Sequence, residues 1–376
     1  MNIDKLQRRF ARILSPASRA YSALMQARAL RYTTKGLAFP YRAHCPVISV
    51  GNIAWGGTGK TPVVEYLLTR AAAEGLNSVV LTRGYKASPP ELPFAVSPEE
   101  TNPLASGDEP LLLARRHPES LVIVDPKRRR AAAWAEKNAR PDIFLLDDGM
   151  QHLDVVRDLD IVLLRPEDLL EQWNKVIPAG SWRESKQALQ RAQAFCLKAD
   201  LPRFTALSTV ASQRLALYGR PLFSFHLAPS GLERLMPYGN TLPETRNDLG
   251  GVPYTLVCGT ANPGQVVTTA THFLGYPPAE TRSFPDHHRY TAMDVRAFCA
   301  SARPVVCTAK DTVKLTALLA DAADTPIWTL GVHAVFGPSL FTQQSFDEWW
   351  LENVRRLLNE RTGVMHTSRD MRETNG

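Results

Sequence analysis

Short apolar runs alternate with helix-like stretches through the first half of the chain. The runs are too short for buried helices and rich in valine, isoleucine and leucine, which is typical of strands buried on both faces of a sheet. They occupy residues 46–50, 78–82, 121–124, 143–146 and 160–164. Helical spacing returns between them, near residues 60–74, 108–116 and 127–138. The pattern predicts an α/β fold around a doubly wound, mostly parallel sheet.

A second, smaller α/β pattern follows after the middle of the chain. It predicts strands at 254–257 and 304–307 and helices near 263–274, 291–302, 311–321 and 343–360. A chain of 376 residues is long enough for two domains. In chain order we expect an N-terminal helical segment, a first core, a linker with strand segments, a smaller α/β domain and a disordered tail, at 1–43, 44–210, 211–252, 253–360 and 361–376.

The loop at residues 51–62 joins the first predicted strand to the first core helix. Glycines let consecutive backbone N–H groups converge on phosphate oxygens, and the helix start adds its positive end. Lys60 can reach the β- and γ-phosphates, and the Thr61 hydroxyl can hold Mg²⁺. The sequence therefore predicts a P-loop NTPase-like core that binds ATP with Mg²⁺, through residues Gly56, Gly57, Thr58, Gly59, Lys60 and Thr61.

One position departs from the usual G-x-x-x-x-G-K-[ST] spacing. The place of its first glycine is taken by Ala54, so the loop must turn with Gly56 and Gly57. A plain glycine-rich turn is the alternative. The preceding strand, the Lys-Thr pair and the following helix favour the phosphate site.

Polar residues follow the other predicted strands of the first core. Arg83 comes after the second strand, Asp125 after the third, and Asp147 with Asp148 after the fourth. Ligands of doubly wound sheets bind beyond the carboxyl ends of the strands. The paired acids therefore predict a Mg²⁺ site, with a simple turn or helix cap as the alternative.

Two further polar clusters allow several interpretations. Asp108 opens a predicted helix, and from the sequence alone a helix cap is the favoured role. Asp286 and His287 lie far away along the chain. This pair could orient a catalytic imidazole, bind a metal or satisfy a turn.

Positive charge is concentrated at the N-terminus. Residues 1–43 hold nine Lys and Arg against one acid, a net charge of +8, while the whole chain carries +7. Leu6, Phe10, Ile13 and Leu14 follow helical spacing there. Such a helix suits an anionic membrane surface, and packing against the protein's own core suits the pattern equally. Nucleic acid is a weaker third partner because aromatic residues are sparse.

The remaining composition indicates an ordinary globular chain, with 44% hydrophobic and 22% charged residues. Its five cysteines are odd in number and lack C-x-x-C spacing, which argues against a disulfide framework and fits a reducing cytoplasm. Neither a signal peptide nor a membrane-spanning run is predicted.

Taken together, the ordered motifs resemble the tetraacyldisaccharide 4'-kinase family, the lipid A 4'-kinases. They are Ser49–Asn52, Gly56–Pro62, Arg83–Tyr85, Gly107–Pro110, Asp147–His152, Arg183–Glu184, Gly259–Pro263, Phe284–His287 and Thr308–Asp311. The family shares the shifted glycine pattern and usually has Phe where this chain has Met150. The resemblance implies transfer of the γ-phosphate of ATP to the 4'-hydroxyl of a tetraacylated glucosamine disaccharide 1-phosphate. It also implies a peripheral enzyme on the cytoplasmic face of the bacterial inner membrane, which favours the membrane role of residues 1–43.

The resemblance also implies roles for individual residues. Asp108 would accept the proton of the sugar hydroxyl, assisted by His287, which Asp286 orients. Lys60 would neutralise the transferred phosphoryl group. The metal would be held by Thr61, Asp147, Asp148 and Glu184, and the phosphates of ATP or substrate by Arg83 and Arg183.

Two other classes of protein remain as alternatives. A P-loop ATPase or GTPase switch acting with a protein partner at the membrane would be expected to carry Asn-Lys-x-Asp if it read guanine. The nearest string, at residues 197–200, has Leu197 in place of the Asn. A membrane-binding adaptor would not need Lys60, Asp108 and Asp147 together. We therefore expect a kinase with an acylated disaccharide lipid as partner, and neither nucleic acid nor an obligate protein partner.

Overall fold

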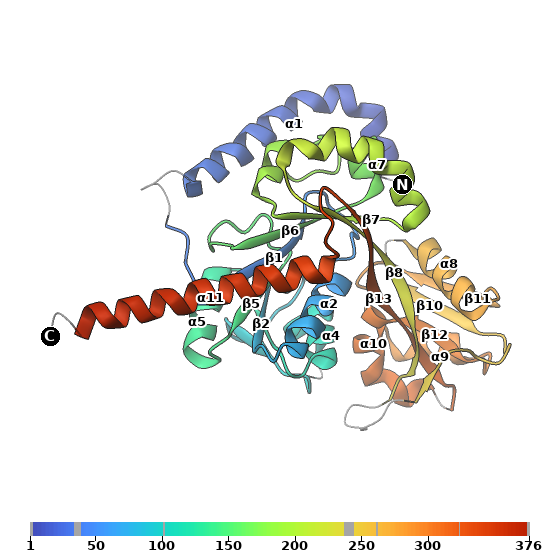
Figure 1. Ribbon diagram of the computed structural model, residues 1–376. Coiled ribbons are helices and arrows are strands. Elements are labelled where there is room, and N and C mark those ends of the chain that lie inside the picture. Colours follow the sequence, from blue (N-terminus) through green and yellow to red (C-terminus); the bar gives the residue numbers. More distant parts are fainter. Residues whose placement is uncertain are drawn as a thin grey trace. The chain divides into compact units, whose positions relative to one another are not determined.

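The computed structural model describes residues 3–33, 39–100, 102–236, 244–260, 262–322 and 324–373, with the side chains of 3–6, 8, 9, 11, 33 and 362–373 left aside. It contains two compact units, each discontinuous along the chain (Figure 1). The first comprises Met1–Arg83, Asp125–His226 and Ala334–Gly376, and the second comprises Gly84–Val124 and Leu227–His333. The two longest strands, β8 (Leu222–Arg234) and β13 (Ile327–Leu340), contribute residues to both.

A parallel sheet forms the centre of the first unit. Its strands lie in the order β8-β7-β6-β1-β5-β2, and each neighbouring pair is parallel. Because β1 lies between β5 and β6, the loops after β1 and β5 leave the same edge side by side. The bounds are β1 Val47–Asn52, β2 Ser78–Thr82, β5 Ile143–Asp147, β6 Leu159–Leu164 and β7 Ala194–Lys198.

Helices and a buried apolar cluster complete this unit. The cluster brings Ile53 of the loop together with Trp182 and Phe195, all of them fully buried. The phosphate loop thus starts from the core of the unit. The helices are α2 Lys60–Ala73, α5 Arg128–Asn138, α6 Pro166–Leu169 and α7 Leu201–Leu215, with 3₁₀ turns at Lys186–Arg191 and Ala216–Tyr218.

The N-terminal helix α1 (Ile3–Thr33) contacts the rest of this unit through several polar side chains, and its Tyr21 packs against the apolar cluster. Gln7 Nε2 donates to the carbonyls of Pro178 and Gly180 at 3.0 and 3.1 Å. Ser18 Oγ accepts from the N–H of Ala179 at 3.0 Å. Further along, Gln26 bonds to Ser185 and Arg28 to the carbonyl of Gln151. Apolar side chains such as Ile13 and Leu24 are instead 75% and 65% exposed.

The second unit holds a smaller parallel set in the order β11-β10-β12-β13. Its strands are β10 Thr255–Gly259, β11 Glu280–Phe284 and β12 Val305–Thr308, and β9 (Thr245–Arg246) pairs antiparallel with β8. The helices are α8 Pro263–Leu274, α9 Ala292–Cys299 and α10 Ala309–Leu315, followed by a 3₁₀ turn at Thr316–Ala322. Asn262 and Thr291 cap α8 and α9 through their side chains, as their residue types favour.

A short insertion also belongs to the second unit. The predicted strand at 121–124 is β4 (Leu121–Val124), and it pairs antiparallel with β3 (Phe94–Val96), which the sequence pattern does not predict. Between them lie α3 (Pro103–Ser106) and α4 (Asp108–Arg116). The start of α4 agrees with the sequence prediction, so Asp108 is the first helical residue.

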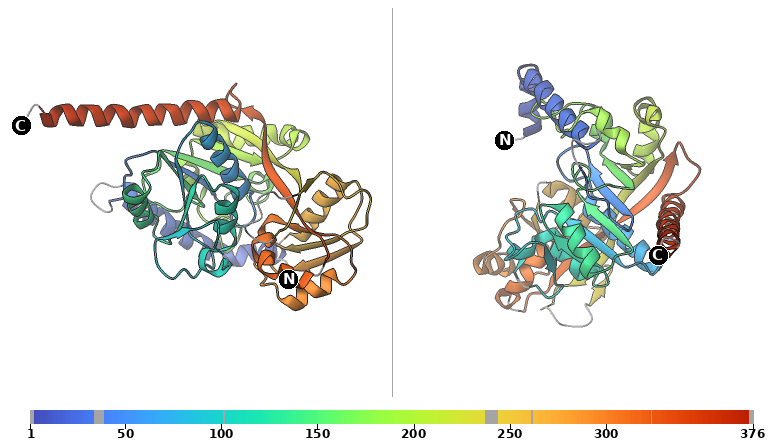
Figure 2. Two further views of the ribbon diagram at one scale, coloured as in Figure 1. Left: turned by 90° about the horizontal axis from the view of Figure 1, so that it is seen from below. Right: turned by 90° about the vertical axis from the view of Figure 1, so that its left-hand side faces the viewer.

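The C-terminal helix corrects one expectation. We predict a disordered tail from residue 361, but α11 (Phe346–Glu373) continues as one helix to Glu373 (Figure 2). Arg, Met and Glu in this stretch favour helix, and proline is absent after residue 346. Residues 374–376 of the predicted tail lie outside the described residues, as do 1–2 and 34–38 of the N-terminal segment, 237–243 of the linker and Ala261.

Two global expectations can be compared with the structure. All five cysteines are buried and free. Among the described residues, the helices include none that is both long and apolar enough to cross a membrane. The predicted domain boundaries, which are continuous ranges, stay a prediction.

Candidate functional site

The glycine-rich loop ends in a helix start that presents Lys60. Gly59 precedes α2 with φ 88°, a left-handed conformation that glycine adopts without strain. Gly56 has φ 103°, so it makes the turn expected of it in the absence of the usual first glycine. Lys60 and Thr61 then occupy the first two helical positions. Free N–H groups at this end of α2 suit a phosphate.

Ala54 has a structural role of its own. It is fully buried and forms an antiparallel bridge with Trp182. On either side of it, Trp55 donates its N–H to the Ser181 carbonyl at 3.0 Å, and Arg183 donates its N–H to the Ile53 carbonyl at 2.6 Å. A β-bridge needs no left-handed residue at this position. The bridge also brings Arg183 and Glu184 to the loop.

Asp148, which directly follows β5, contacts the loop that follows the neighbouring strand β1. Its carboxylate lies 3.5 Å from Lys60 Nζ and accepts two contacts from Arg183 Nη1, at 3.0 and 2.8 Å. Burial raises the pKa of Asp148, but the charges of Lys60 and Arg183 outweigh it and hold the pKa below its ordinary value. Arg183 also bonds to Gln151, and Lys60 to Asn52 at 3.2 Å. These contacts pre-orient two cations for a polyphosphate.

The residues predicted to hold a metal share hard oxygen donors. Asp147 is 5% exposed and accepts from Thr82 Oγ1 at 3.2 Å, while Glu184 is 4% exposed and pairs with Arg191 at 2.7 Å. Thr58 is buried, and its hydroxyl forms no hydrogen bond within the described residues. The described side chains include no ready cage of three or more His, Cys, Asp or Glu. This set fits Mg²⁺, which binds through one or two carboxylates together with substrate phosphates.

A buried cation lies next to these acids. Arg128 is fully buried and donates to the carbonyls of Asp125 and Asp147. Burial lowers the pKa of Arg128 to about 10, against the opposing effect of Asp147. Burial and the charge of Arg128 also lower the pKa of His152 to about 4, with a smaller effect from Arg83, which is itself exposed. Sequence reasoning does not identify Arg128, although its place just after a strand end could have indicated it.

A second centre lies in the other unit, around Asp108. His287 Nδ1 is 3.1 Å from Asp108 Oδ2, and its other nitrogen, Nε2, is 3.8 Å from Asp286. Asp108 therefore lies nearer to His287 than Asp286 does. The imidazole is held chiefly by Asp108, although the sequence-based expectation is that Asp286 orients it. His287 has φ 62°, a strained conformation for a residue with a side chain, and the Tyr85 ring packs 5.3 Å from it.

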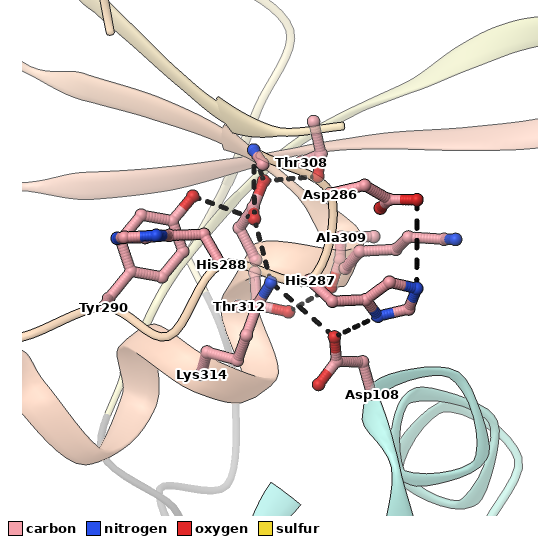
Figure 3. Close-up of polar contacts among 12 residues, drawn as sticks. Asp108, Asp286, His287, His288, Tyr290, Thr308, Ala309, Thr312 and Lys314 are labelled. Carbon is pink, nitrogen blue, oxygen red and sulfur yellow. Dashed lines mark hydrogen bonds and ion pairs between the residues drawn. The ribbon is translucent and has the colours of Figure 1, made fainter. Parts of the chain in front are cut away.

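Side chains that the sequence reasoning misses surround this pair. Lys314 Nζ is 3.6 Å from Asp108 Oδ2 and 3.3 Å from Asp311, and Tyr290 donates its hydroxyl to Asp311 (Figure 3). The three-residue spacing of Asp311 and Lys314 on a predicted helix was a usable signal, because such residues share one face.

Comparison with known proteins finds relatives along nearly the whole chain. The family model described as Tetraacyldisaccharide-1-P 4'-kinase matches residues 10–352. A tetraacyldisaccharide 4'-kinase of Nitratidesulfovibrio vulgaris is 51% identical, over 97% of this chain and 100% of its own. That of Oleidesulfovibrio alaskensis is 45% identical, over 94% and 98%. Among solved structures, LpxK from Aquifex aeolicus in complex with ATP aligns with a TM-score of 0.72 and 25% identity, over 93% of this chain and 99% of the other.

Proposed function

The chain belongs to the tetraacyldisaccharide-1-phosphate 4'-kinase family, and on that premise we propose how its residues transfer the γ-phosphate of ATP to the sugar. Its reaction is the phosphorylation of the lipid disaccharide at the 4'-position. The observation that carries the proposal is the presence of one centre suited to phosphates, with Lys60 at a helix start, and another suited to a proton, with Asp108 bonded to His287. We assign both centres to the same phosphoryl transfer.

The first unit would hold the nucleotide. Loop N–H groups from Gly56 to Lys60 would bind the β-phosphate, while Lys60 and Arg183 would meet the negative charge of the transferred group. Arg83 would add a cation at the end of β2. Mg²⁺ would be held by Thr61, Asp147, Asp148 and Glu184, and when bound it neutralises phosphate charge.

The second unit would hold the proton acceptor. As the 4'-oxygen bonds to the γ-phosphorus, the bond from that phosphorus to the bridging oxygen of ADP breaks, and the hydroxyl proton passes to Asp108. His287 would keep the Asp108 carboxylate oriented through the 3.1 Å contact. Asp286, 3.8 Å from the far nitrogen of the same ring, would help to orient the imidazole.

The kinase proposal is tested by direct transfer. Purified full-length protein with radiolabelled ATP and tetraacyldisaccharide 1-phosphate should place label on the lipid at its 4'-position. A deacylated disaccharide in the same assay shows how much the acyl chains contribute. If substrate of verified structure stays unlabelled while ATP is bound, the proposal is wrong.

The role of Asp108 has a separate test. We expect Asp108→Ala to lower kcat by about 10²–10⁴-fold, since this is what a positioned general base contributes, and to leave the KM for ATP within about twofold. Thermal unfolding of the variant controls for loss of fold. Equal losses in kcat and ATP affinity would count against a proton acceptor.

We further propose that α1 attaches the enzyme to the cytoplasmic face of the inner membrane. The helix directs buried polar side chains, Gln7 and Ser18, toward the protein and leaves Ile13 and Leu24 exposed. Tyr21 packs against the apolar cluster, but a helix that merely covered the core would bury Ile13 and Leu24 as well. Together with the net charge of +8 in residues 1–43, this favours an anionic lipid surface. Such a place suits a substrate whose acyl chains remain in a bilayer.

Vesicle binding tests this attachment. The double variant Ile13→Ser, Leu24→Ser should bind vesicles of phosphatidylglycerol and phosphatidylethanolamine at least about tenfold more weakly, because two apolar side chains no longer enter the acyl boundary. Leu217→Ser is the matched control, since Leu217 is 69% exposed in the same unit. Binding of the wild type should weaken with salt. Equal binding by the double variant and the control would contradict the proposal.

A further inference from the structure

One buried lysine in the second unit lies between two carboxylates. Lys314 is 9% exposed in its side chain, with Nζ 3.3 Å from Asp311 Oδ1 and 3.6 Å from Asp108 Oδ2 (Figure 3). Its ammonium also lies 5.3 Å from the centre of the Tyr290 ring, within reach of a cation–π contact. A lysine side chain is flexible and loses rotamer entropy when it is ordered in such a place, so its contacts must be strong enough to hold it.

Asp311 holds Lys314 in place through an ion pair. Its side chain is fully buried, and it accepts from Tyr290 Oη at 2.9 Å, from Thr308 Oγ1 at 2.6 Å and from the N–H of Gly259. The fit leaves little room, since a Cβ on Gly259 would lie 2.9 Å from Asp311 Oδ1. A buried carboxylate with this many donors is fixed in place.

We propose that Lys314 is a positioning residue that holds the Asp108 carboxylate aimed at the sugar hydroxyl; this rests on the proposed role of Asp108 as proton acceptor. His287 and Lys314 both approach Oδ2 of Asp108, so Oδ1 is the oxygen that receives the proton. Two carboxylates against one ammonium leave one net negative charge, which the arriving proton neutralises. Without Lys314, the carboxylates of Asp108 and Asp311 would repel each other, and Asp108 would lose the contact that holds it in place.

The other charged and titratable groups around Asp108 do not offer the same contact. Glu109, the next residue of α4, forms an ion pair with Lys310 of α10. Asp286 and the Tyr85 ring both face His287. Lys314 is therefore the cation whose ammonium joins Asp108 to the fully bonded Asp311.

Conservative and non-conservative variants test the proposal. Lys314→Met keeps the length of the side chain without its charge, and we expect kcat to fall by about tenfold or more with the KM for ATP and for lipid within about twofold. Lys314→Arg should recover part of the rate, because it restores the charge. Arg296→Met is the control for loss of a cation in the same unit, since Arg296 is paired with Asp321 and 66% exposed.

A double variant separates this inference from the proposed function. In an Asp108→Asn background, Lys314→Met should change the residual single-turnover rate by less than about twofold, because its effect passes through the carboxylate. If Lys314→Met lowered the rate in that background as much as in the wild type, the positioning role would be overturned. A rise in the KM for lipid in place of a fall in kcat would also overturn it and would indicate substrate binding. An active Asp108→Asn enzyme would instead refute the proposed acceptor. Thermal unfolding and retained ATP binding verify that every variant is folded.

Discussion

The two centres of this protein are built in different ways. The proposed nucleotide centre of the first unit depends on backbone, namely a glycine-rich turn and a helix start, and its residues lie in short local motifs. The centre of the second unit depends on side chains that meet across the sequence, since Asp108 and His287 are 179 residues apart. A site for phosphates can be encoded locally, whereas a site for one proton is assembled by the fold.

Their charges differ as well. Around Asp148 the carboxylate is matched by Lys60 and Arg183, with buried Arg128 behind, an arrangement that favours a polyanion. Around Asp108 the carboxylates outnumber Lys314. Cations in the first unit repel a proton, and the net negative charge in the second attracts one. The comparison predicts that variants in the two units will fail in different kinetic constants.

The largest expected effect comes from Lys60→Met. We expect kcat/KM for ATP to fall by about 10³-fold, or about 4 kcal/mol, because the variant removes the charge that we propose to contact the transferring phosphate. Unlike Asp108→Ala, it should weaken ATP binding, which equilibrium titration with a fluorescent ATP analogue would measure. Arg70→Met, at the exposed end of the same helix, is the control. Unchanged ATP binding would remove the distinction between the centres.

The second prediction concerns protons in the first unit. The pKa of His152 is lowered from 6.5 to about 4, so the folded protein resists protonation there while the unfolded chain does not. As the pH falls from about 6.5 to about 4, the free energy of unfolding should decrease by up to about 3 kcal/mol through this residue, and above pH 6.5 it contributes no slope. Urea unfolding of wild type and His152→Gln at several pH values would measure the difference. Parallel curves for the two proteins would refute it.

The smallest effect is expected from Arg183→Lys. The charge near Asp148 is kept, but the guanidinium that contacts both Asp148 and Gln151 is lost. We expect kcat/KM for ATP to fall by roughly tenfold, about 1.4 kcal/mol. If kinetics with Lys at this position matched the wild type, the fork geometry would be irrelevant and only the charge would matter.

Much of the fold follows from the sequence pattern. The predicted family, the α/β kinase fold and the kinase activity are confirmed by the family match, the relatives and the solved structure. Strands such as β2 are predictable because both faces are buried and every residue suits a strand. The loop is predictable because its chemistry needs glycines, a lysine and a threonine in one order.

What the pattern misses has physical reasons. β11 has no apolar run because its middle residues are exposed, and β13 contains Gly331 and the pair Gly337-Pro338, which weaken a strand prediction. Lys314 and Tyr290 acquire their roles only through contacts with Asp311, which folding brings to them. The antiparallel bridge at Ala54 is equally invisible, because its partner Trp182 lies far along the chain.

The stretch from Pro178 to Ser185 has a consequence for how the enzyme responds to its surroundings. It receives the hydrogen bonds of α1 on one side, and on the other it fastens the start of the phosphate loop through Ser181 and Arg183. On the proposed roles, this one short peptide therefore contacts both the helix that binds the bilayer and the loop that binds the nucleotide. Reciprocity then requires that any change a bilayer makes in ATP affinity is matched by an equal change that ATP makes in attachment to the bilayer.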